Sequence, residues 1–382
     1  MKTLLLGYYG SRNLGDDMMM VCLLDCLQAQ NAHVIVISED PAETESRFRV
    51  PAIQNVPLMG EWGPHTVWLK GTAFRLIREI WSSEALVVGG GDLIRDDLNW
   101  RIYFYTVEKI LLALALGRSV YLVNVGIPRP RTWYGRKCLR WILHRCQSVI
   151  VRDMRSAELC REYAPGLRCS QAPDVVMHLP EMVYGSLSAV PFHKPPSQSD
   201  TIVVCLRGQP NMYGRYSLDN RHIQGFAKCL DHCVSKHGLR VVFLPFQQGD
   251  EWGDEPLHRQ VLAAMKRSES ATVRKWTGDF KDVMERIGNA RMVFAMRLHA
   301  AILGLGLRRP CILMPYDQKL DELGKQFGLK PDIRPKDLEE PSALIHALDK
   351  YLDGIDFQVT QSYGMAWKKT VFHYFLTPQP LN

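Results

Sequence analysis

The chain has 382 residues and a formal charge of +7, from 47 Lys+Arg and 40 Asp+Glu. Its 46% hydrophobic and 23% charged residues are typical of a folded globular protein, and this length favours two domains. The basic residues do not cluster with interleaved aromatic residues, so we expect no nucleic-acid partner. No apolar run reaches the roughly 18 residues of a membrane span, and the N-terminal run is too short for a signal peptide, which predicts a cytoplasmic protein.

Short apolar segments alternate with helical segments in the first half of the chain, a pattern typical of parallel α/β domains. The predicted strands are residues 3–6, 34–37, 85–88, 119–123 and 148–151. The predicted helices are residues 16–28, 100–116, 134–146 and 155–163.

The periodicity stops near residues 181–200, where the composition is that of a linker, and then begins again. The second half has predicted strands at 202–206, 240–244, 292–295 and 311–314, with a late helix at 341–352. We therefore expect an N-terminal Rossmann-like domain over 1–185, a linker over 186–200, a C-terminal Rossmann-like domain over 201–352, and a segment over 353–382 that packs back on the first domain. Two such domains facing across a cleft resemble the GT-B architecture.

The loops after the first and third predicted strands are rich in glycine. Gly7, Gly10 and Gly15 do not have the spacing of a dinucleotide-binding loop, and the chain has no GxxxxGK[ST] phosphate loop. The same loops carry Asn13, Asp16, Asp17 and Asp92, whose oxygen atoms suit sugar hydroxyls. Aspartate also commonly caps a helix, and this second interpretation stays open for Asp16.

Four cations follow four separate apolar runs: Arg152, Arg207, Arg297 and Lys319. At one edge of a sheet they would repel one another unless an anion of high charge shared the space. Such mutual repulsion favours a ligand with two acidic groups. An ordinary ion pair is the alternative, and Arg152 has Asp153 and Glu158 nearby in the sequence.

His299 follows an apolar strand at the predicted start of a helix, two residues after Arg297. A helix N-terminus favours anions, and a histidine there can exchange protons near neutral pH. We therefore consider His299 a candidate general acid. A histidine that braces the loop is the alternative.

Motifs along most of the chain resemble the polysaccharide pyruvyl transferase family: Gly7-Tyr8-Tyr9-Gly10 with Asn13 and Gly15-Asp16-Asp17, Gly89-Gly90-Gly91, Arg152-Asp153 with Ser156, Pro173-Asp174, Arg297-Leu298-His299, and Tyr316-Asp317 with Lys319. The resemblance implies an enzyme with a GT-B-like fold that transfers the enolpyruvyl group of phosphoenolpyruvate to a sugar of a polysaccharide or glycolipid precursor of the cell envelope. The product is a pyruvate ketal, and phosphate is released. The resemblance also places Arg152 and His299 in phosphoenolpyruvate binding and catalysis.

Together, the residues and the resemblance predict the following roles. His299 is the general acid, and Asp17 or Asp16 is the base for the acceptor hydroxyl. The phosphoenolpyruvate ligands are Arg152, Arg207, Arg297 and Lys319, and the acceptor-sugar contacts are Tyr9, Asn13 and Asp92. No metal or cofactor is required besides phosphoenolpyruvate as the donor.

Several alternatives stay open. A GT-B glycosyltransferase that uses a nucleotide sugar and a non-catalytic glycan-binding protein would each suit the same fold. The sugar acceptor can be lipid-linked or free.

The basic segment 129–145 can lie on the inner face of a membrane or be a solvated helix. The pairs Cys22/Cys26 and Cys229/Cys233, the latter near His232 and His237, favour reduced core cysteines over a metal site.

Overall fold

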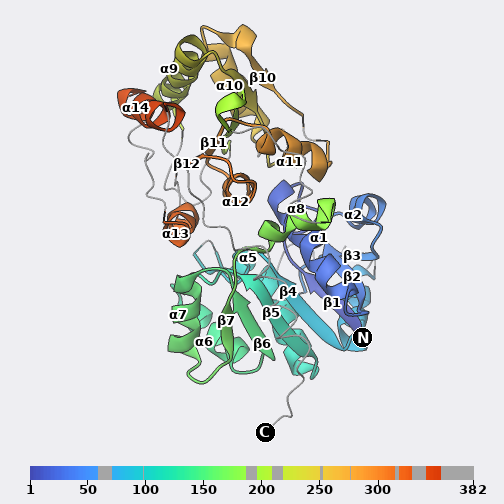
Figure 1. Cartoon of the computed structure of the whole chain (residues 1–382). Coiled ribbons are helices and arrows are strands. Elements are labelled where there is room, and N and C mark those ends of the chain that lie inside the picture. The colour runs from blue at the N-terminus through green and yellow to red at the C-terminus, as the bar shows by residue number, and fades with distance from the viewer. Residues whose placement is uncertain are drawn as a thin grey trace. The chain divides into compact units, whose positions relative to one another are not determined.

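The computed structural model of the chain describes residues 1–58, 71–97, 99–185, 196–208, 218–249, 253–275, 277–314, 318–328 and 341–353 (Figure 1). The chain forms two compact units, of which the first contains Met1–His178 and the second begins at Leu179. Most of the predicted linker, residues 186–195, lies outside the described residues, as does nearly all of the predicted C-terminal segment, residues 354–382.

The first unit is built on a parallel seven-stranded sheet in the order β3-β2-β1-β4-β5-β6-β7. Its strands are β1 (Lys2–Leu6), β2 (His33–Ser38), β3 (Ala52–Gln54), β4 (Ala85–Gly89), β5 (Ser119–Val125), β6 (Ser148–Val151) and β7 (Cys169–Gln171). Leu5 of β1 pairs with Val36 of β2 on one side and Val87 of β4 on the other. The strand order reverses direction at β1, which is where Rossmann-like sheets bind ligands.

Helices cover both faces of this sheet. They are α1 (Leu14–Gln28), α2 (Pro41–Phe48), α4 (Thr72–Ser82), α5 (Trp100–Ala115), α6 (Trp133–Leu143), α7 (Met154–Tyr163) and the 3₁₀ helix η1 (Val175–His178). Apolar residues of α4, α5, α6 and α7 share one core with Leu4 and Leu6 of β1. Leu5 points to the other face, where it lies beside Leu23 of α1. The central strands are therefore buried on both sides, as in other parallel sheets.

The second unit contains a parallel five-stranded sheet in the order β10-β9-β8-β11-β12. Its strands are β8 (Thr201–Cys205), β9 (Arg240–Phe243), β10 (Ala271–Val273), β11 (Met292–Ala295) and β12 (Cys311–Leu313). Its helices are α8 (Leu179–Tyr184), η3 (Pro196–Gln198), α9 (Asn220–His237), α10 (Glu255–Ala264), η4 (Ser268–Ser270), α11 (Phe280–Gly288), α12 (Leu298–Gly306), α13 (Gln318–Gln326) and α14 (Pro341–Leu352). Residues of α9, α10 and α14 form one core with β8, β9 and β11.

The predicted α/β class with two Rossmann-like domains is confirmed by these sheets. Each strand predicted from the sequence is present within one or two residues at each end. The strands that were not predicted are β3, β7 and β10, three residues each, which lie at sheet edges. Segments that short have no measurable periodicity, so only tertiary pairing reveals them.

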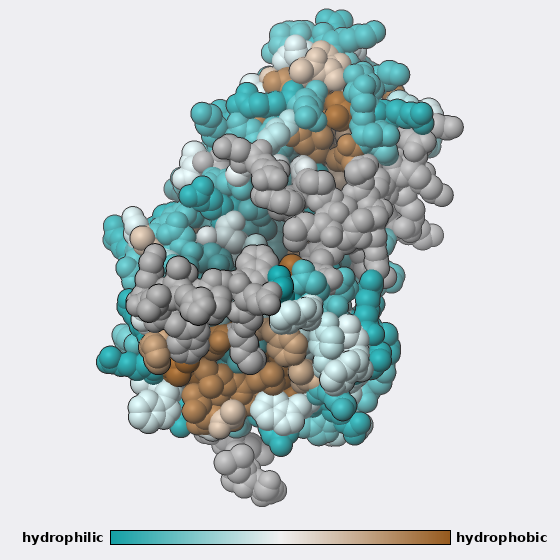
Figure 2. Space-filling model, turned by 180° about the vertical axis from the view of Figure 1, so that it is seen from behind, coloured by the Kyte–Doolittle hydropathy of each residue, from teal (hydrophilic) through white to brown (hydrophobic). Residues whose placement is uncertain are grey.

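Within the described residues, no helix combines the length and the apolar composition needed to cross a bilayer. Apolar side chains nevertheless reach the surface of the first unit, where they gather in one area (Figure 2).

Candidate functional site

Tyr9 lies beneath the two glycine loops of the first unit. A Cβ atom added at Gly7 would lie 2.2 Å from its ring, and its hydroxyl donates to the Gly89 carbonyl at 2.6 Å. Burial, with a smaller contribution from Asp16, raises the pKa of this hydroxyl well above its usual value. Because its hydroxyl is bound to Gly89 and its ring lies against Gly7, Tyr9 braces the two loops instead of contacting a sugar, contrary to the expectation from the sequence.

Asn13 caps helix α1. Its Oδ1 accepts hydrogen bonds from the backbone N–H groups of Gly15 at 3.0 Å and Asp16 at 3.4 Å. The interpretation of Asp16 as the cap is therefore wrong, since Asp16 occupies the first turn of the helix instead. Its Oδ1 lies 4.0 Å from the position of a Cβ atom at Gly91, so it faces the second glycine loop.

Asp17 is a buried carboxyl, 1% exposed. Arg47 Nη2 lies 3.1 Å from its Oδ2, while its Oδ1 accepts no hydrogen bond from the described residues. Burial raises the pKa of Asp17 to about 6, and the attraction of Arg47 only partly offsets this effect. A carboxyl that titrates near neutral pH is suited to general base chemistry.

Arg152 lies between two carboxylates at the carboxyl ends of β4, β6 and β7. Its Nη2 is 2.8 Å from Asp92 Oδ1, and its Nη1 is 3.1 Å from Asp174 Oδ2. Burial alone would lower the pKa of the guanidinium, but Asp92 and Asp174 outweigh it and raise the pKa above its usual value. Arg152 is therefore a buried cation whose charge the protein itself neutralises.

Asn124 positions Asp174. It interrupts β5 with a positive φ of 58°, and its amide donates to the Pro173 carbonyl at 2.9 Å and accepts from the Val175 N–H at 2.9 Å. Gly126 then leaves room for the ion pair, because a Cβ atom there would lie 2.1 Å from Asp92 Oδ1. Neither residue was predicted. The available sequence signal was that Asn124 and Gly126 come at the end of an apolar run, where site residues are expected.

Arg297 of the second unit forms a bidentate ion pair with Asp254. Its Nε lies 2.9 Å from Asp254 Oδ2, and its Nη2 donates to Asp254 Oδ1. Asp254 is fully buried and also accepts from the backbone N–H groups of Gly208, Phe246 and Gln247 at 2.9–3.0 Å. Burial would raise its pKa, but Arg297 and these donors hold the pKa below its usual value. Asp254 was not predicted from the sequence.

His258 supports the loop that carries Arg207. Its Nε2 lies 3.1 Å from the Leu206 N–H, which donates to it. Burial lowers the pKa of this imidazole to about 4, which keeps it neutral at physiological pH. A neutral acceptor is the form that this hydrogen bond requires.

The remaining predicted residues of the second unit follow neighbouring strands. Arg207 follows β8, His299 is the second residue of α12 after β11, and Lys319 is the second residue of α13 after β12. All three are partly buried. In parallel sheets these strand ends share one edge, so the three residues lie along the same edge of the second sheet as Arg297. Asn13, Asp16, Asp17, Asp92 and Arg152 belong to the corresponding edge of the first unit.

Carboxylates of the chain itself neutralise two of the four cations, so a doubly acidic ligand is not needed for them, contrary to the expectation from the sequence. Asp92 and Asp174 pair with Arg152, and Asp254 pairs with Arg297. The sequence could not reveal these pairs because the partners lie 22 to 60 residues apart along the chain.

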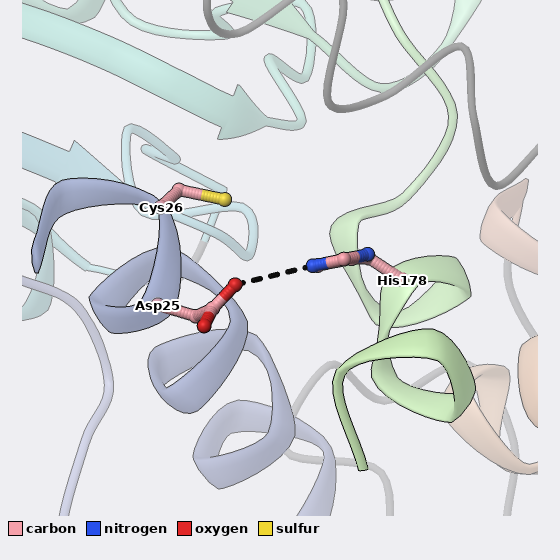
Figure 3. A group of neighbouring side chains, drawn as sticks. All are labelled: Asp25, Cys26 and His178. Atoms are coloured by element: carbon pink, nitrogen blue, oxygen red, sulfur yellow. Dashed lines mark hydrogen bonds and ion pairs between the residues drawn. The ribbon is translucent and has the colours of Figure 1, made fainter. Parts of the chain in front are cut away.

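Two groups of side chains bring together atoms that can bind metal ions. In the first, His178 Nε2 lies 3.3 Å from Asp25 Oδ2, with Cys26 beside them (Figure 3). In the second, Nε2 of His232 and of His237 lie 2.9 and 2.7 Å from Asp349 Oδ1. Cys229 and Cys233 are buried in the core of the second unit, as expected for reduced cysteines.

The model of the polysaccharide pyruvyl transferase family matches residues 13–318. The chain belongs to this family. The match covers both sheets except strand β1, and it includes Asn13, Asp16, Asp17, Asp92, Arg152, Arg207, Arg297 and His299. The chain has no match among curated proteins.

Solved structures show the same fold at low sequence identity. UDP-GlcNAc 2-epimerase from Methanocaldococcus jannaschii has a TM-score of 0.65 and 13% identity, over 99% of this chain and 100% of that one. The epimerase from Neisseria meningitidis, bound to UDP-GlcNAc, has a TM-score of 0.64 and 13% identity over 98% and 100%. UDP-N-acetylglucosamine 2-epimerase from Rickettsia bellii has a TM-score of 0.56 and 10% identity over 98% and 95%. The likeness concerns the fold alone.

Proposed function

We propose that the protein transfers the enolpyruvyl group of phosphoenolpyruvate to a sugar of a polysaccharide or glycolipid precursor and closes it into a pyruvate ketal. Family membership supports a transferase of this kind. The observation that carries the proposal is the edge of the second sheet, where His299 lies in the first turn of α12 and the neighbouring strand ends carry Arg207, Arg297 and Lys319.

The reaction divides into two steps. In the first, C3 of phosphoenolpyruvate accepts a proton, and C2 forms a bond to the oxygen of an acceptor hydroxyl, which loses its own proton to a base. In the second, another hydroxyl of the sugar attacks C2 and loses its proton to the departing phosphate as the bond from C2 to the phosphate oxygen breaks, so that hydrogen phosphate leaves. The first step needs a general acid and the second needs stabilised phosphate.

His299 is the proposed acid for C3. Its position in the first turn of α12 places it beside backbone N–H groups that favour anions, so the carboxylate and phosphate of the donor suit this edge. Arg207 and Lys319 are the proposed contacts to those anionic groups. Because Arg297 already pairs with Asp254, we propose that it mainly positions the Gly208 loop and the start of α12.

Asp17 is the proposed base. A carboxylate with a pKa of about 6 is ionised at neutral pH and still accepts a proton more readily than an exposed aspartate. Asp16, Asn13 and Asp92 lie at the same edge and suit sugar hydroxyls. A role for Arg152 in phosphoenolpyruvate binding requires the ligand to compete with Asp92 and Asp174, so we propose that Arg152 mainly orders these two carboxylates.

A thermal-shift experiment tests the choice of donor. A ligand that binds only the folded protein raises its melting temperature with concentration. We expect phosphoenolpyruvate at millimolar concentration to stabilise the protein and UDP-GlcNAc to have no comparable effect. Stabilisation by UDP-GlcNAc alone would favour a nucleotide-sugar enzyme, a reading that the ligand of the Neisseria epimerase motivates.

Mass spectrometry tests the reaction. The acceptor is envelope polysaccharide of the source organism, freed of pyruvate by mild acid and cut to oligosaccharides. With phosphoenolpyruvate and protein, we expect each modified oligosaccharide to gain one pyruvate less one water. In a parallel incubation with a nucleotide sugar in place of phosphoenolpyruvate, a gain of one hexose less one water would contradict the proposal.

A further inference from the structure

Large apolar side chains are exposed mainly at one edge of the first unit. Among the described residues, those with more than a third of their surface exposed are Met1, Tyr8, Phe74, Trp81, Trp100, Ile102, Trp133 and Met154. Met1 and Trp81 lie at the start of β1 and at the end of α4. The other six lie directly after β1 or within the first three residues of α4, α5, α6 and α7.

The topology explains why these positions coincide. All strands of this sheet are parallel, and α4, α5, α6 and α7 pack side by side on one face, so each helix starts at the carboxyl edge of the sheet. Their first turns therefore form one border. We call Phe74, Trp100, Ile102, Trp133 and Met154 the apolar rim; their exposed fractions are 62, 48, 37, 66 and 52%. Asp16, Asp92 and Arg152 belong to the same edge of the sheet.

The starts of α5 and α6 are in direct contact. The ring of Tyr134 lies 5.6 Å from Tyr103 and 5.9 Å from both Phe104 and Trp133, measured between ring centroids. Trp100 and Trp133 thus flank an aromatic cluster that joins the two helices. Two large apolar side chains exposed on neighbouring helices are unfavourable in water. They suit an apolar or interfacial environment.

The surroundings of these tryptophans are basic. Residues 99–107 and 129–147 contain no aspartate or glutamate. The exposed cations in these segments include Arg101, Arg131, Arg136, Lys137 and Arg140. Arg101 lies 5.4 Å from the ring centroid of Trp100, and Lys137 lies 5.2 Å from that of Trp133. The surface therefore combines interfacial aromatic residues with two segments in which all charged side chains are cationic.

We propose that the apolar rim docks the first unit onto an anionic phospholipid bilayer. Tryptophan prefers the headgroup level of a membrane, and each nearby lysine or arginine adds attraction to anionic lipid. The rim borders the edge where the acceptor is proposed to bind, so the docked protein receives an acceptor that is anchored in the same lipid. This last step rests on the proposed function, whereas the docking does not.

Co-sedimentation with phospholipid vesicles tests the docking. The full-length protein is mixed with vesicles of phosphatidylcholine alone or with one third phosphatidylglycerol. We expect binding only to the anionic vesicles, and weaker binding in high salt, which screens the charges. Replacing two cations in R136S/K137S should weaken partitioning about thirtyfold, since each contributes on the order of 1 kcal/mol.

Matched tryptophan variants locate the surface. W100S/W133S removes both anchors of the rim and should reduce partitioning at least tenfold. W81S removes an equally exposed tryptophan, 65% exposed, from the far end of α4 and should leave partitioning unchanged. All these side chains are exposed, so circular dichroism should show the same fold in each variant.

Two outcomes would overturn the proposal: no binding of the wild-type protein to anionic vesicles, or equal loss of binding in W81S and W100S/W133S. Self-association of the wild-type protein that W100S/W133S abolishes, without vesicle binding, would assign the rim to a protein interface instead. Activity on the soluble oligosaccharide is measured in parallel. Its absence with intact vesicle binding would count against the pyruvyl transfer alone.

Discussion

Arg297 and Asp254 form a bidentate ion pair beside the first turn of α12, which contains His299, with Arg297 Nε 2.9 Å from Asp254 Oδ2. The arginine of the Arg297-Leu298-His299 motif is therefore bound to a carboxylate of its own chain. Through Asp254 it holds the backbone of Gly208, Phe246 and Gln247. Its role in this structure is to fix loops from two other strands relative to His299.

Loss of this pair should strongly destabilise the protein. D254N leaves the buried Arg297 guanidinium without a counter-charge, and breaking such a pair costs about 3–5 kcal/mol in the free energy of unfolding. Urea denaturation measures this loss. The control is E255Q at the next residue, whose partner Arg259 is 58% exposed; it should cost under about 1 kcal/mol. Equal effects of the two variants would contradict a structural role for the Arg297 pair.

Asp17 should make both stability and activity depend on pH. Its raised pKa means that the native state binds more protons than the unfolded state between about pH 4 and 6, so stability falls as pH rises through this window. Above pH 6 the penalty is about 3 kcal/mol, at about 1.4 kcal/mol for each pKa unit. D17N should therefore be more stable than wild type at pH 8 by up to this amount and similar below pH 4.

The D17N variant, although more stable than wild type at pH 8, should be less active. Wild-type turnover should rise with pH through about 6 as Asp17 ionises, whereas D17N should have little turnover at any pH. Initial rates across the pH range check this. A D17N variant that keeps wild-type turnover would show that Asp17 is not the base.

The sequence predicts the long elements of this fold well and its charge pairing poorly. Central strands such as 85–88 and 292–295 are continuous apolar runs because both their faces are buried, so local composition identifies them. The position of His299 follows from the same reasoning. The partners of Arg152 and Arg297 do not, because an ion pair between distant segments has no local signature. The prediction that Tyr9 contacts the sugar was wrong for a related reason. Only the packing in the folded chain shows that its ring lies beneath Gly7.

Asn124 should be needed both for its backbone conformation and for its side chain. N124G keeps the positive φ without strain but loses the hydrogen bonds to Pro173 and Val175, which should cost about 1–3 kcal/mol and reduce turnover by releasing Asp174. N124A should cost about 1–2 kcal/mol more, because alanine is strained at this φ. Arg49 also has a positive φ, and its side chain is exposed, so R49G should not destabilise the protein. Thermal denaturation ranks the three variants.

The kinetics of R152Q distinguish two roles for Arg152. If Arg152 orders Asp92 and Asp174, R152Q should raise KM for the acceptor sugar and leave KM for phosphoenolpyruvate within about threefold. If Arg152 binds phosphoenolpyruvate directly, as the family resemblance implies, KM for phosphoenolpyruvate should rise most. Initial rates with each substrate varied in turn decide between the two roles.

Phosphate release from phosphoenolpyruvate in the presence of the oligosaccharide acceptor tests the central claim most directly. Wild-type protein should release phosphate only when the acceptor is present, and H299Q should release at least about a hundredfold less, as expected for loss of a general acid. The control H144Q changes an exposed histidine that follows α6 and should match wild type. Acceptor-dependent release by H299Q at the wild-type rate, or no release by the wild-type protein, would contradict the account.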